Sequence, residues 1–426
     1  MAGAAGGHHP KGRRRAWFLI GTTLAAAALA GARLAPDVWP GHAAPPRQPA
    51  SRVVVSALNE IFDARAAALV KGDPSLIEAL YETGGTATAR KALEHEARKL
   101  RYVQAWASKR RVTITGADTH LQVKSVALGR DVASTVVWQS LNVRYRPSAR
   151  PAAADTAFGI RTRHKMTLVR KGGKWVVRAD EYTDPLGEDT LAPEVAPAAW
   201  LEPADSVDFV YPPSAPNALP PEAAAARSPG GTVRGQQYDR ARAVAYADRY
   251  CGVKVAAGRE SGYNPLYCDY TDMGGDCTNF VSQVLGDSKA GGLPHDSAWH
   301  YDYSSPKGGS RAWVETDAFA AHLTSSGMAR LLARGSFRDV QAPTPRFPRG
   351  ALGELEPGDI IAYEEKGEIQ HFAVITAKDP SGYLLVNTHT ADRHRVPWDL
   401  GWDRNTIFWI FKVVVHGGQL QPPLKG

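Results

Sequence analysis

The chain has 426 residues, of which 43% are hydrophobic and 22% charged, so most of it is globular and it is long enough for two or three domains. Its three cysteines exclude a disulfide-rich miniprotein and a four-cysteine zinc site. The net charge of +8 is a mild surplus that suits contact with anionic surfaces, and it gives no indication of nucleic-acid binding.

The N-terminus has the order of an export signal. Basic residues at 11–15 precede an uncharged, mostly apolar run at 16–32, which ends in small residues. An uncleaved anchor helix is the alternative, but a run of this length is at the lower limit for spanning a bilayer. We therefore predict a signal peptide over 1–32 and a secreted or cell-surface protein that meets the membrane only through this segment.

A Pro- and Ala-rich spacer at 33–50 is followed by the first periodic sequence. Helical spacing of apolar residues predicts three helices within 53–106. Alternating apolar residues within 112–177 then predict long antiparallel strands. Helices followed by a strand meander indicate an α+β domain over 51–184.

This order of elements is similar to that of nuclear-transport-factor-like (cystatin-like) domains, in which a curved sheet wraps a helix. The resemblance is one of topology and rests on no motif. His95, His120 and His164 are isolated in the sequence. We therefore expect this domain to serve localisation or partner binding, and not chemistry.

Residues 185–235 are rich in proline and have no apolar period, which predicts an extended linker. A linker of that composition leaves the domains on its two sides able to act apart. The alternative is that residues 51–184 cover the catalytic cleft, with the short aromatic patch Val207–Tyr211 as the contact.

One cysteine of the C-terminal half is placed for chemistry. Periodic sequence resumes with a helix capped by Asp239, and apolar residues then follow Cys277 at positions +3, +4, +7 and +8. Cys277 is therefore predicted to open an amphipathic helix on its inward face, where the N–H groups and the helix dipole favour a thiolate. The alternative is that Cys277 is a small buried side chain of the core.

The other two cysteines, Cys251 and Cys268, lie close in the sequence. An exported protein is expected to oxidise a compatible pair. We predict a Cys251–Cys268 disulfide, which leaves Cys277 as the odd and reactive thiol.

Three apolar runs within 359–389 are separated by turns and predict a strand meander. His371 begins the second strand, and Asn387 and His389 share a face of the third. A helix that presents Cys, followed by a sheet that presents His and a polar residue, is the arrangement that thiol hydrolysis needs. The His takes the thiol proton and later donates it to the leaving amine, while the third group orients the ring.

The run D-C-T-N-F-V-S-Q, with Y-N-P-x-Y upstream and L-x-P-G-D-I and Q-H-F-A-V-I-T downstream, resembles the "Putative amidase domain" family. That family belongs to the papain-like cysteine hydrolase superfamily, beside the NlpC-type and CHAP peptidoglycan hydrolases. The resemblance spans 238–415 and implies a papain-like α+β catalytic domain over 236–416, which leaves 417–426 as a tail. No motif of the family is found in the first 235 residues.

The resemblance also implies roles for single residues. Cys277 matches the nucleophile of the family and His371 its general base. His389 and Asn387 are both candidates for the third residue, and we favour His389 because of the H-T-x-D-R run around it. The papain-type Gln six residues before the nucleophile is replaced by Thr271.

The oxyanion would then be bound by the backbone N–H of Cys277 and a side chain from the preceding loop, with Asn264 and Tyr267 as candidates and Asn387 as a further substrate contact. His389, Asp392 and His394 do not have the spacing of a zinc site, and we expect no metal and no other cofactor.

The sequence as a whole predicts a secreted, monomeric, thiol-dependent amide hydrolase that acts on a peptide or on a cell-wall amide. The alternative is a secreted binding or scaffolding protein whose papain-like fold has lost its activity. The intact pair of Cys277 and His371 favours the enzyme.

Overall fold

The computed structural model describes nearly all of the predicted helices and strands. The described residues are 49–82, 84, 86–182, 238–254, 262–305 and 308–414. The predicted signal peptide, nearly all of the spacer, the Pro-rich linker with Val207–Tyr211, and the tail lie outside them. Within the described ranges, no helix has the length and apolar character that crossing a membrane requires.

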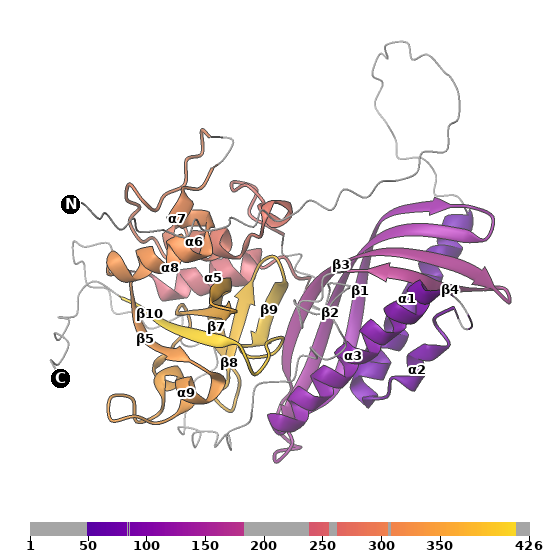
Figure 1. The fold of residues 1–426 in the computed structure, drawn as a ribbon, viewed down its shortest axis with the longest axis horizontal. Helices are drawn as coiled ribbons and strands as arrows, with labels where there is room; N and C mark the ends of the chain where they lie inside the picture. The colour runs from indigo at the N-terminus through magenta and orange to yellow at the C-terminus, as the bar shows by residue number, and fades with distance from the viewer. Residues whose placement is uncertain are drawn as a thin grey trace, which may run out of the picture. The chain divides into compact units, whose positions relative to one another are not determined.

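The N-terminal half consists of helices followed by a strand meander, so the α+β prediction is confirmed. Its elements are α1 (Pro49–Lys71), α2 (Ser75–Glu78), α3 (Ala87–Lys109), β1 (Val112–Leu128), β2 (Val132–Pro147), β3 (Thr156–Lys171) and β4 (Lys174–Glu181). Each strand pairs antiparallel with the next. The helices pack against the strands, and apolar side chains of both form one buried core (Figure 1).

The C-terminal half is also a mixture of helices and antiparallel strands. Its elements are α5 (Arg240–Tyr250), η2 (Thr271–Met273), α6 (Cys277–Gly286), α7 (Arg311–Val314), α8 (Thr316–Ser325), β5 (Ala329–Gly335), α9 (Phe337–Gln341), η3 (Ala351–Glu354), β6 (Ile360–Glu365), β7 (Glu368–Lys378), β8 (Leu384–Thr388), β9 (Asp392–Pro397) and β10 (Ile407–Val413). Asp239 caps α5 by accepting a hydrogen bond from the backbone N–H of Arg242. Cys277 is the first residue of α6, as its spacing predicts. Strands β5 and β9 were not predicted.

The strands of the C-terminal half carry helices on both faces. Figure 1 shows α5 to α8 gathered on one side of these strands and α9 on the other. Along β7, Phe372 and Val374 join the core formed with α6, whereas Ala373 and Ile375 join the core on the α9 side. This alternation decides which side chains of β7 face α6.

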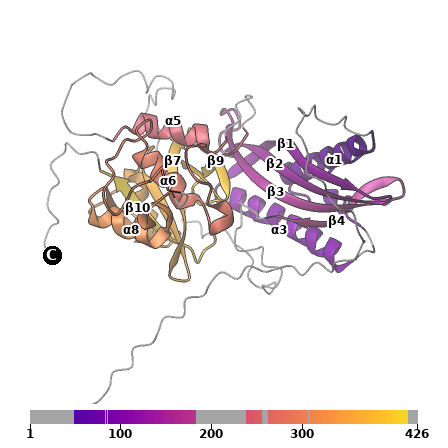
Figure 2. The ribbon, with the colours of Figure 1, turned by 90° about the horizontal axis from the view of Figure 1, so that it is seen from above.

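One sheet runs through both halves. The described strands are ordered β1-β2-β3-β9-β8-β7-β6-β10-β5, and β4 also pairs with β3. The joint is the antiparallel pair of β3 and β9, centred on Ile160 opposite Arg393. Both ribbon views show β9 next to the magenta strands (Figure 1, Figure 2). Gly159, at one end of this pairing, lies close to the segment after α5, because a Cβ atom there would be 2.8 Å from Cγ1 of Val253.

Helix α3 is bound to the C-terminal half by buried polar contacts. Nε of Arg110 donates to Asp399 at 2.7 Å, and the indole N–H of Trp106 donates to the same carboxylate at 3.2 Å. The hydroxyl of Tyr383 donates to Asp399 as well, at 2.6 Å. The prediction that the two halves act apart is therefore wrong, because a shared sheet and a buried ion pair join them. The domain boundaries at 184 and 236 stay a prediction.

A cluster of buried charges lies in the core of the N-terminal half. Arg65 donates to Asp180 at 2.8 Å, and Nδ1 of His164 lies 3.0 Å from the same carboxylate. Glu96 pairs with Lys99 at 2.9 Å and lies 3.9 Å from Arg65. His164 is thus not isolated in the fold, because β3 and β4 are neighbours and bring it to Asp180.

These contacts shift the ionisation of the two carboxyl groups. Burial alone would raise the pKa of Glu96, but the charges of Lys99 and Arg65 outweigh it and hold this pKa well below its ordinary value. The pKa of Asp180 is lowered against burial in the same way, by His164 and Arg65. A carboxylate with a lowered folded-state pKa stabilises the fold above its unfolded-state pKa of about 4. That stabilisation is lost as the pH falls through the folded-state value.

We expect Glu96→Gln to lower the free energy of unfolding at pH 7 by about 3–5 kcal/mol, since the buried charge of Lys99 then lacks its counter-charge. Between about pH 5 and pH 2 the variant should lose less stability than the parent protein, because one titrating carboxylate is gone. Urea unfolding at several pH values measures both effects. Glu94→Gln, on the exposed side of the same helix, is the control. Equal stability of the two variants would contradict the prediction.

Candidate active site

The start of α6 is built by the first and last residues of the motif D-C-T-N. Asp276 accepts hydrogen bonds from the backbone N–H of Tyr270 at 2.9 Å and from Nδ2 of Asn279 at 2.8 Å. Asn279 also donates to the carbonyl of Cys268 at 3.0 Å. Both residues therefore fold the preceding loop against the helix and fix the position of Cys277, which is 5% exposed.

Two glycines allow the chain to enter α6 at this angle. Gly274 and Gly275 have φ values of 117° and 122°, which side-chain-bearing residues rarely adopt. A Cβ atom at Gly275 would also lie 3.4 Å from Oγ1 of Thr390. The loop that carries the candidate nucleophile is therefore held close to the segment after β8.

His389 lies at this same helix end. Its Nδ1 is 2.6 Å from Oδ2 of Asp276, and its Nε2 is 2.5 Å from the carbonyl oxygen of Tyr250. Its ring is stacked between Tyr263, at 3.7 Å, and Phe280 of α6, at 4.0 Å. Both ring nitrogens face acceptors, which is the arrangement that a doubly protonated imidazolium satisfies.

His371 lies on the opposite face of the sheet. Its ring packs near Tyr363 and Trp402, which belong to the core on the α9 side, and its Nε2 is 2.6 Å from Oγ1 of Thr388. Burial, together with the charges of Arg393 and His389, lowers the pKa of His371 well below its ordinary value. His371 is therefore neutral at pH 7, and of the two candidate histidines it is His389 that the structure brings to α6.

Asn387 ties β8 to α5. Its Nδ2 donates to Asp248 at 2.9 Å, and its Oδ1 accepts hydrogen bonds from the hydroxyl of Thr376 and the backbone N–H of Arg395. All of these partners lie within the fold. These contacts hold two elements together, and the role of Asn387 as a substrate contact stays a prediction.

The two side chains considered for the oxyanion are engaged in other hydrogen bonds. Asn264 donates to the hydroxyl of Tyr246 at 2.8 Å. Tyr267 donates to Asp287 at 2.8 Å and lies 2.9 Å from the hydroxyl of Tyr303. Both residues organise the loop before α6, so their predicted role stays a prediction that these contacts do not support.

All three cysteines lie in the described part of the chain, and none is disulfide-bonded. The predicted Cys251–Cys268 bridge is therefore not formed. Cys251 is buried at the end of α5, where its thiol lies 3.6 Å from the carbonyl oxygen of Asp248. Cys268 is partly exposed, and its thiol faces the carbonyl of Asp269.

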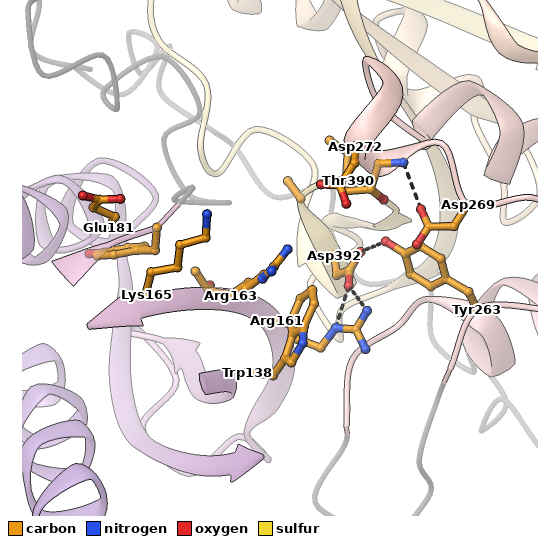
Figure 3. A pocket seen from close by; sticks show the side chains of 14 residues that line it. Trp138, Arg161, Arg163, Lys165, Glu181, Tyr263, Asp269, Asp272, Thr390 and Asp392 are labelled. Carbon is orange, nitrogen blue, oxygen red and sulfur yellow. Dashed lines mark hydrogen bonds and ion pairs between the residues drawn. The ribbon is translucent and has the colours of Figure 1, made fainter. Parts of the chain in front are cut away.

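A cavity of about 560 Å³ lies beside this site, where β3 meets the loop before α6 and the segment after β8. The N-terminal half contributes one wall with Trp138, Arg161, Arg163 and Lys165 (Figure 3). None of these four residues was predicted as a site residue, although the alternative that residues 51–184 cover the catalytic cleft places this half beside the site. Asp392, considered for a metal, instead binds Arg161 at 2.7 Å and Tyr263 at 2.6 Å.

Comparison with known proteins connects this geometry with a family. Residues 237–411 match the model of the family described as "Putative amidase domain". The uncharacterized protein YhbB of Bacillus subtilis (strain 168) is 29% identical over 167 residues, which cover 39% of this chain and 45% of that relative. The chain thus spans less than half the length of this curated relative. The family match supports an amidase-like, hydrolytic enzyme in this part of the chain.

Several solved structures are similar to about a third of the chain. They include an NTF2-like family protein from Streptomyces avermitilis (13% identity, 30% of this chain and 94% of that chain, TM-score 0.23). The Kfla4162 protein from Kribbella flavida (12%, 31% and 90%, TM-score 0.23) is another. A third is an NTF-2-like protein of unknown function from Shewanella oneidensis MR-1 (9%, 31% and 99%, TM-score 0.20). Similarity at this level supports no statement about function.

Proposed function

We propose that residues 237–411 form a thiol-dependent amide hydrolase of the papain-like type, with Cys277 as the nucleophile. One observation carries the proposal. Cys277 is the first residue of α6. Oδ2 of the preceding Asp276 lies 2.6 Å from Nδ1 of His389 and so holds this ring at the same helix end. The match of this segment to an amidase family supports the same reaction class.

In the proposed reaction, the Cys277 thiolate attacks the amide carbonyl carbon and forms a C–S bond. The N–H groups at the start of α6 face the oxygen that becomes negative. His389 donates its Nε2 proton to the leaving amine as the C–N bond breaks, and Asp276 keeps the ring oriented through Nδ1. Water, deprotonated by the now neutral His389, then attacks the thioester carbonyl, and breaking of the C–S bond releases the acid and regenerates the thiolate beside a protonated His389.

This assignment gives His389 the role that the sequence resemblance gives to His371. Nε2 of His389 donates to the carbonyl of Tyr250 in the described conformation, and catalysis requires that it exchange this acceptor for the substrate. His371 acts as a positioning residue, since it is bonded to Thr388, the neighbour of His389.

The second candidate is a secreted binding or scaffolding protein on the same fold. Two observations favour it: Cys277 is almost completely buried, and both ring nitrogens of His389 are already hydrogen-bonded within the protein. The two candidates differ in whether the thiol reacts with an amide-like group at all.

A thiol-directed amide analogue tests the proposal. We expect a covalent adduct that peptide mapping locates at Cys277 and that forms at least about 100-fold more slowly in His389→Ala and Asp276→Asn. His371→Gln should slow the reaction much less, because that side chain lies on the other face of the sheet. An adduct rate that depends on His371 and not on His389 would restore the sequence-based assignment. No adduct at Cys277 would favour the scaffold.

We further propose that the enzyme is exported and acts on peptide or cell-wall amides. The basic and apolar N-terminal segments and the net charge of +8 support export and an anionic surrounding. Zymography on purified wall material tests this part of the proposal. A clearing zone that Cys277→Ala abolishes is the expected result, and activity on free peptides alone would contradict the wall as substrate.

A further inference from the structure

The cavity beside the candidate active site has two walls of different charge. Arg161, Arg163 and Lys165 alternate along β3 and so share one face of the strand. Asp269 and Asp272 come from the loop that leads to Cys277. Figure 3 shows the ends of Arg163 and Lys165 directed into the space between the two walls.

One pair of charges in this cavity is already satisfied. Arg161 binds Asp392 through Nε at 2.7 Å and Nη2 at 2.6 Å, and its guanidinium lies 4.5 Å from the ring centre of Trp138. Tyr263 donates to the same carboxylate at 2.6 Å. These four side chains form the base of the cavity, in which the charges of Arg161 and Asp392 cancel. A charged ligand would therefore bind to the other charged groups of the cavity.

Arg163, Lys165 and Asp272 also line the cavity. Among the described residues, neither Arg163 nor Lys165 forms an ion pair or a side-chain hydrogen bond, and the same is true of Asp272. Glu181 lies opposite Lys165 on β4 and offsets part of its charge. Arg163 is therefore the strongest anion-binding group of one wall, and Asp272, with Asp269 beside it, is the cation-binding group of the other.

Two contacts connect the cavity to the proposed nucleophile. The ring of Tyr263, which lines the cavity, is stacked on His389. Oγ1 of Thr390, which also lines it, accepts a hydrogen bond at 2.5 Å from the backbone N–H of Asp276, the residue before Cys277. A ligand in the cavity would therefore lie directly beside the start of α6.

We propose that this cavity binds a zwitterionic peptide, with its carboxylate on Arg163 and its ammonium group on Asp272. A guanidinium binds a carboxylate through two parallel hydrogen bonds, which makes Arg163 selective for that group. Trp138 and Tyr263 supply apolar surface for the part of the peptide between its charges. The proposal rests on the proposed function for the reaction, but the binding itself requires no catalysis. It also gives the N-terminal half a direct part in substrate recognition.

Calorimetric titration of the full chain carrying Cys277→Ala tests the proposal, with trialanine, its N-acetyl form and its C-terminal amide as probes. Blocking either end of trialanine should weaken binding by about tenfold or more, since each block removes one charge-assisted contact. Arg163→Ala should weaken the binding of trialanine to a similar extent and leave that of the amide nearly unchanged. Asp272→Ala should likewise weaken the binding of trialanine and leave that of the N-acetyl form nearly unchanged.

Arg130→Ala and Asp317→Ala, two exposed positions outside the cavity, are the matched controls and should change none of the affinities. Equal affinity for the free and blocked peptides would overturn the proposal, as would an equal loss for all three probes in Arg163→Ala. No binding of trialanine at about 10 mM would overturn it as well. If only the proposed function fails, charge-selective binding persists while the parent protein hydrolyses none of the peptides.

Discussion

Replacing Cys277 with alanine is expected to lower the rate of amide hydrolysis by at least about 10⁴-fold, because removal of a nucleophile abolishes the covalent route and leaves only binding and oxyanion stabilisation. The fold should persist, since Asp276 and Asn279 hold the start of α6 through their side-chain hydrogen bonds. Steady-state kinetics on a chromogenic peptide amide measures the loss, and circular dichroism checks the fold.

Cys268→Ala is the matched control for this experiment. Cys268 is partly exposed and lies on the loop before α6, and its thiol is 3.9 Å from the carbonyl oxygen of the adjacent Asp269. We expect this variant to keep its activity within about threefold, in line with a substitution outside the reacting groups. Undiminished activity of Cys277→Ala would exclude thiol catalysis altogether.

The second large effect is expected at the joint between the two halves. Asp399→Ala removes the counter-charge of the buried Arg110 and the acceptor of Trp106, and it should lower the free energy of unfolding by about 3–5 kcal/mol. Because one sheet runs through both halves, the parent protein should unfold in a single transition. Urea unfolding followed by tryptophan fluorescence and by circular dichroism measures both properties.

Asp317→Ala, at an exposed position of α8, should change the stability by less than about 0.5 kcal/mol. Two separate unfolding transitions in the parent protein would contradict the prediction that the shared sheet makes the two halves unfold together. Stability of Asp399→Ala equal to that of the control would contradict the importance of the buried contact with α3.

The local parts of the candidate site could be predicted from the sequence. The spacing of Phe280, Val281, Val284 and Leu285 after Cys277 is a property of one helix, and α6 begins where this spacing predicts. The turn and strand signals within 359–389 likewise correspond to β6, β7 and β8. Such signals depend only on neighbouring residues, which the sequence displays directly.

The face on which His371 lies could not be predicted in the same way. The pairing of β6 with β7 shifts between Tyr363 and Glu364, next to His371, and that of β7 with β8 shifts between Ile375 and Ala377. A shift of one residue moves a side chain to the other face of a sheet. The resemblance to a family can identify His371 as part of a motif. The face of the sheet on which its side chain lies depends on irregularities of strand pairing, which the sequence does not reveal.

The joint between the halves was missed for a different reason. Strand β9 is short and carries charged residues, so it has none of the apolar alternation that predicts a strand. Its charges are accounted for by partners from elsewhere: Asp392 binds Arg161, and Arg393 donates to the carbonyl of Leu400. These partners become neighbours only in the folded chain. Without them in view, the proline-rich linker was interpreted as a sign of independent domains.

The pairing of β3 with β9 also sets an order on the folding of the chain. Arg161 and Asp392 are separated by 231 positions, so their contact closes a very long loop. During synthesis the N-terminal half emerges first, and until residue 399 follows, Arg110 has no buried counter-charge and the edge of β3 at 159–161 has no partner strand. Contacts this distant in sequence make folding slow and leave strand edges exposed in the meantime. The N-terminal half of this protein thus completes its structure only when residues 392–399 reach it.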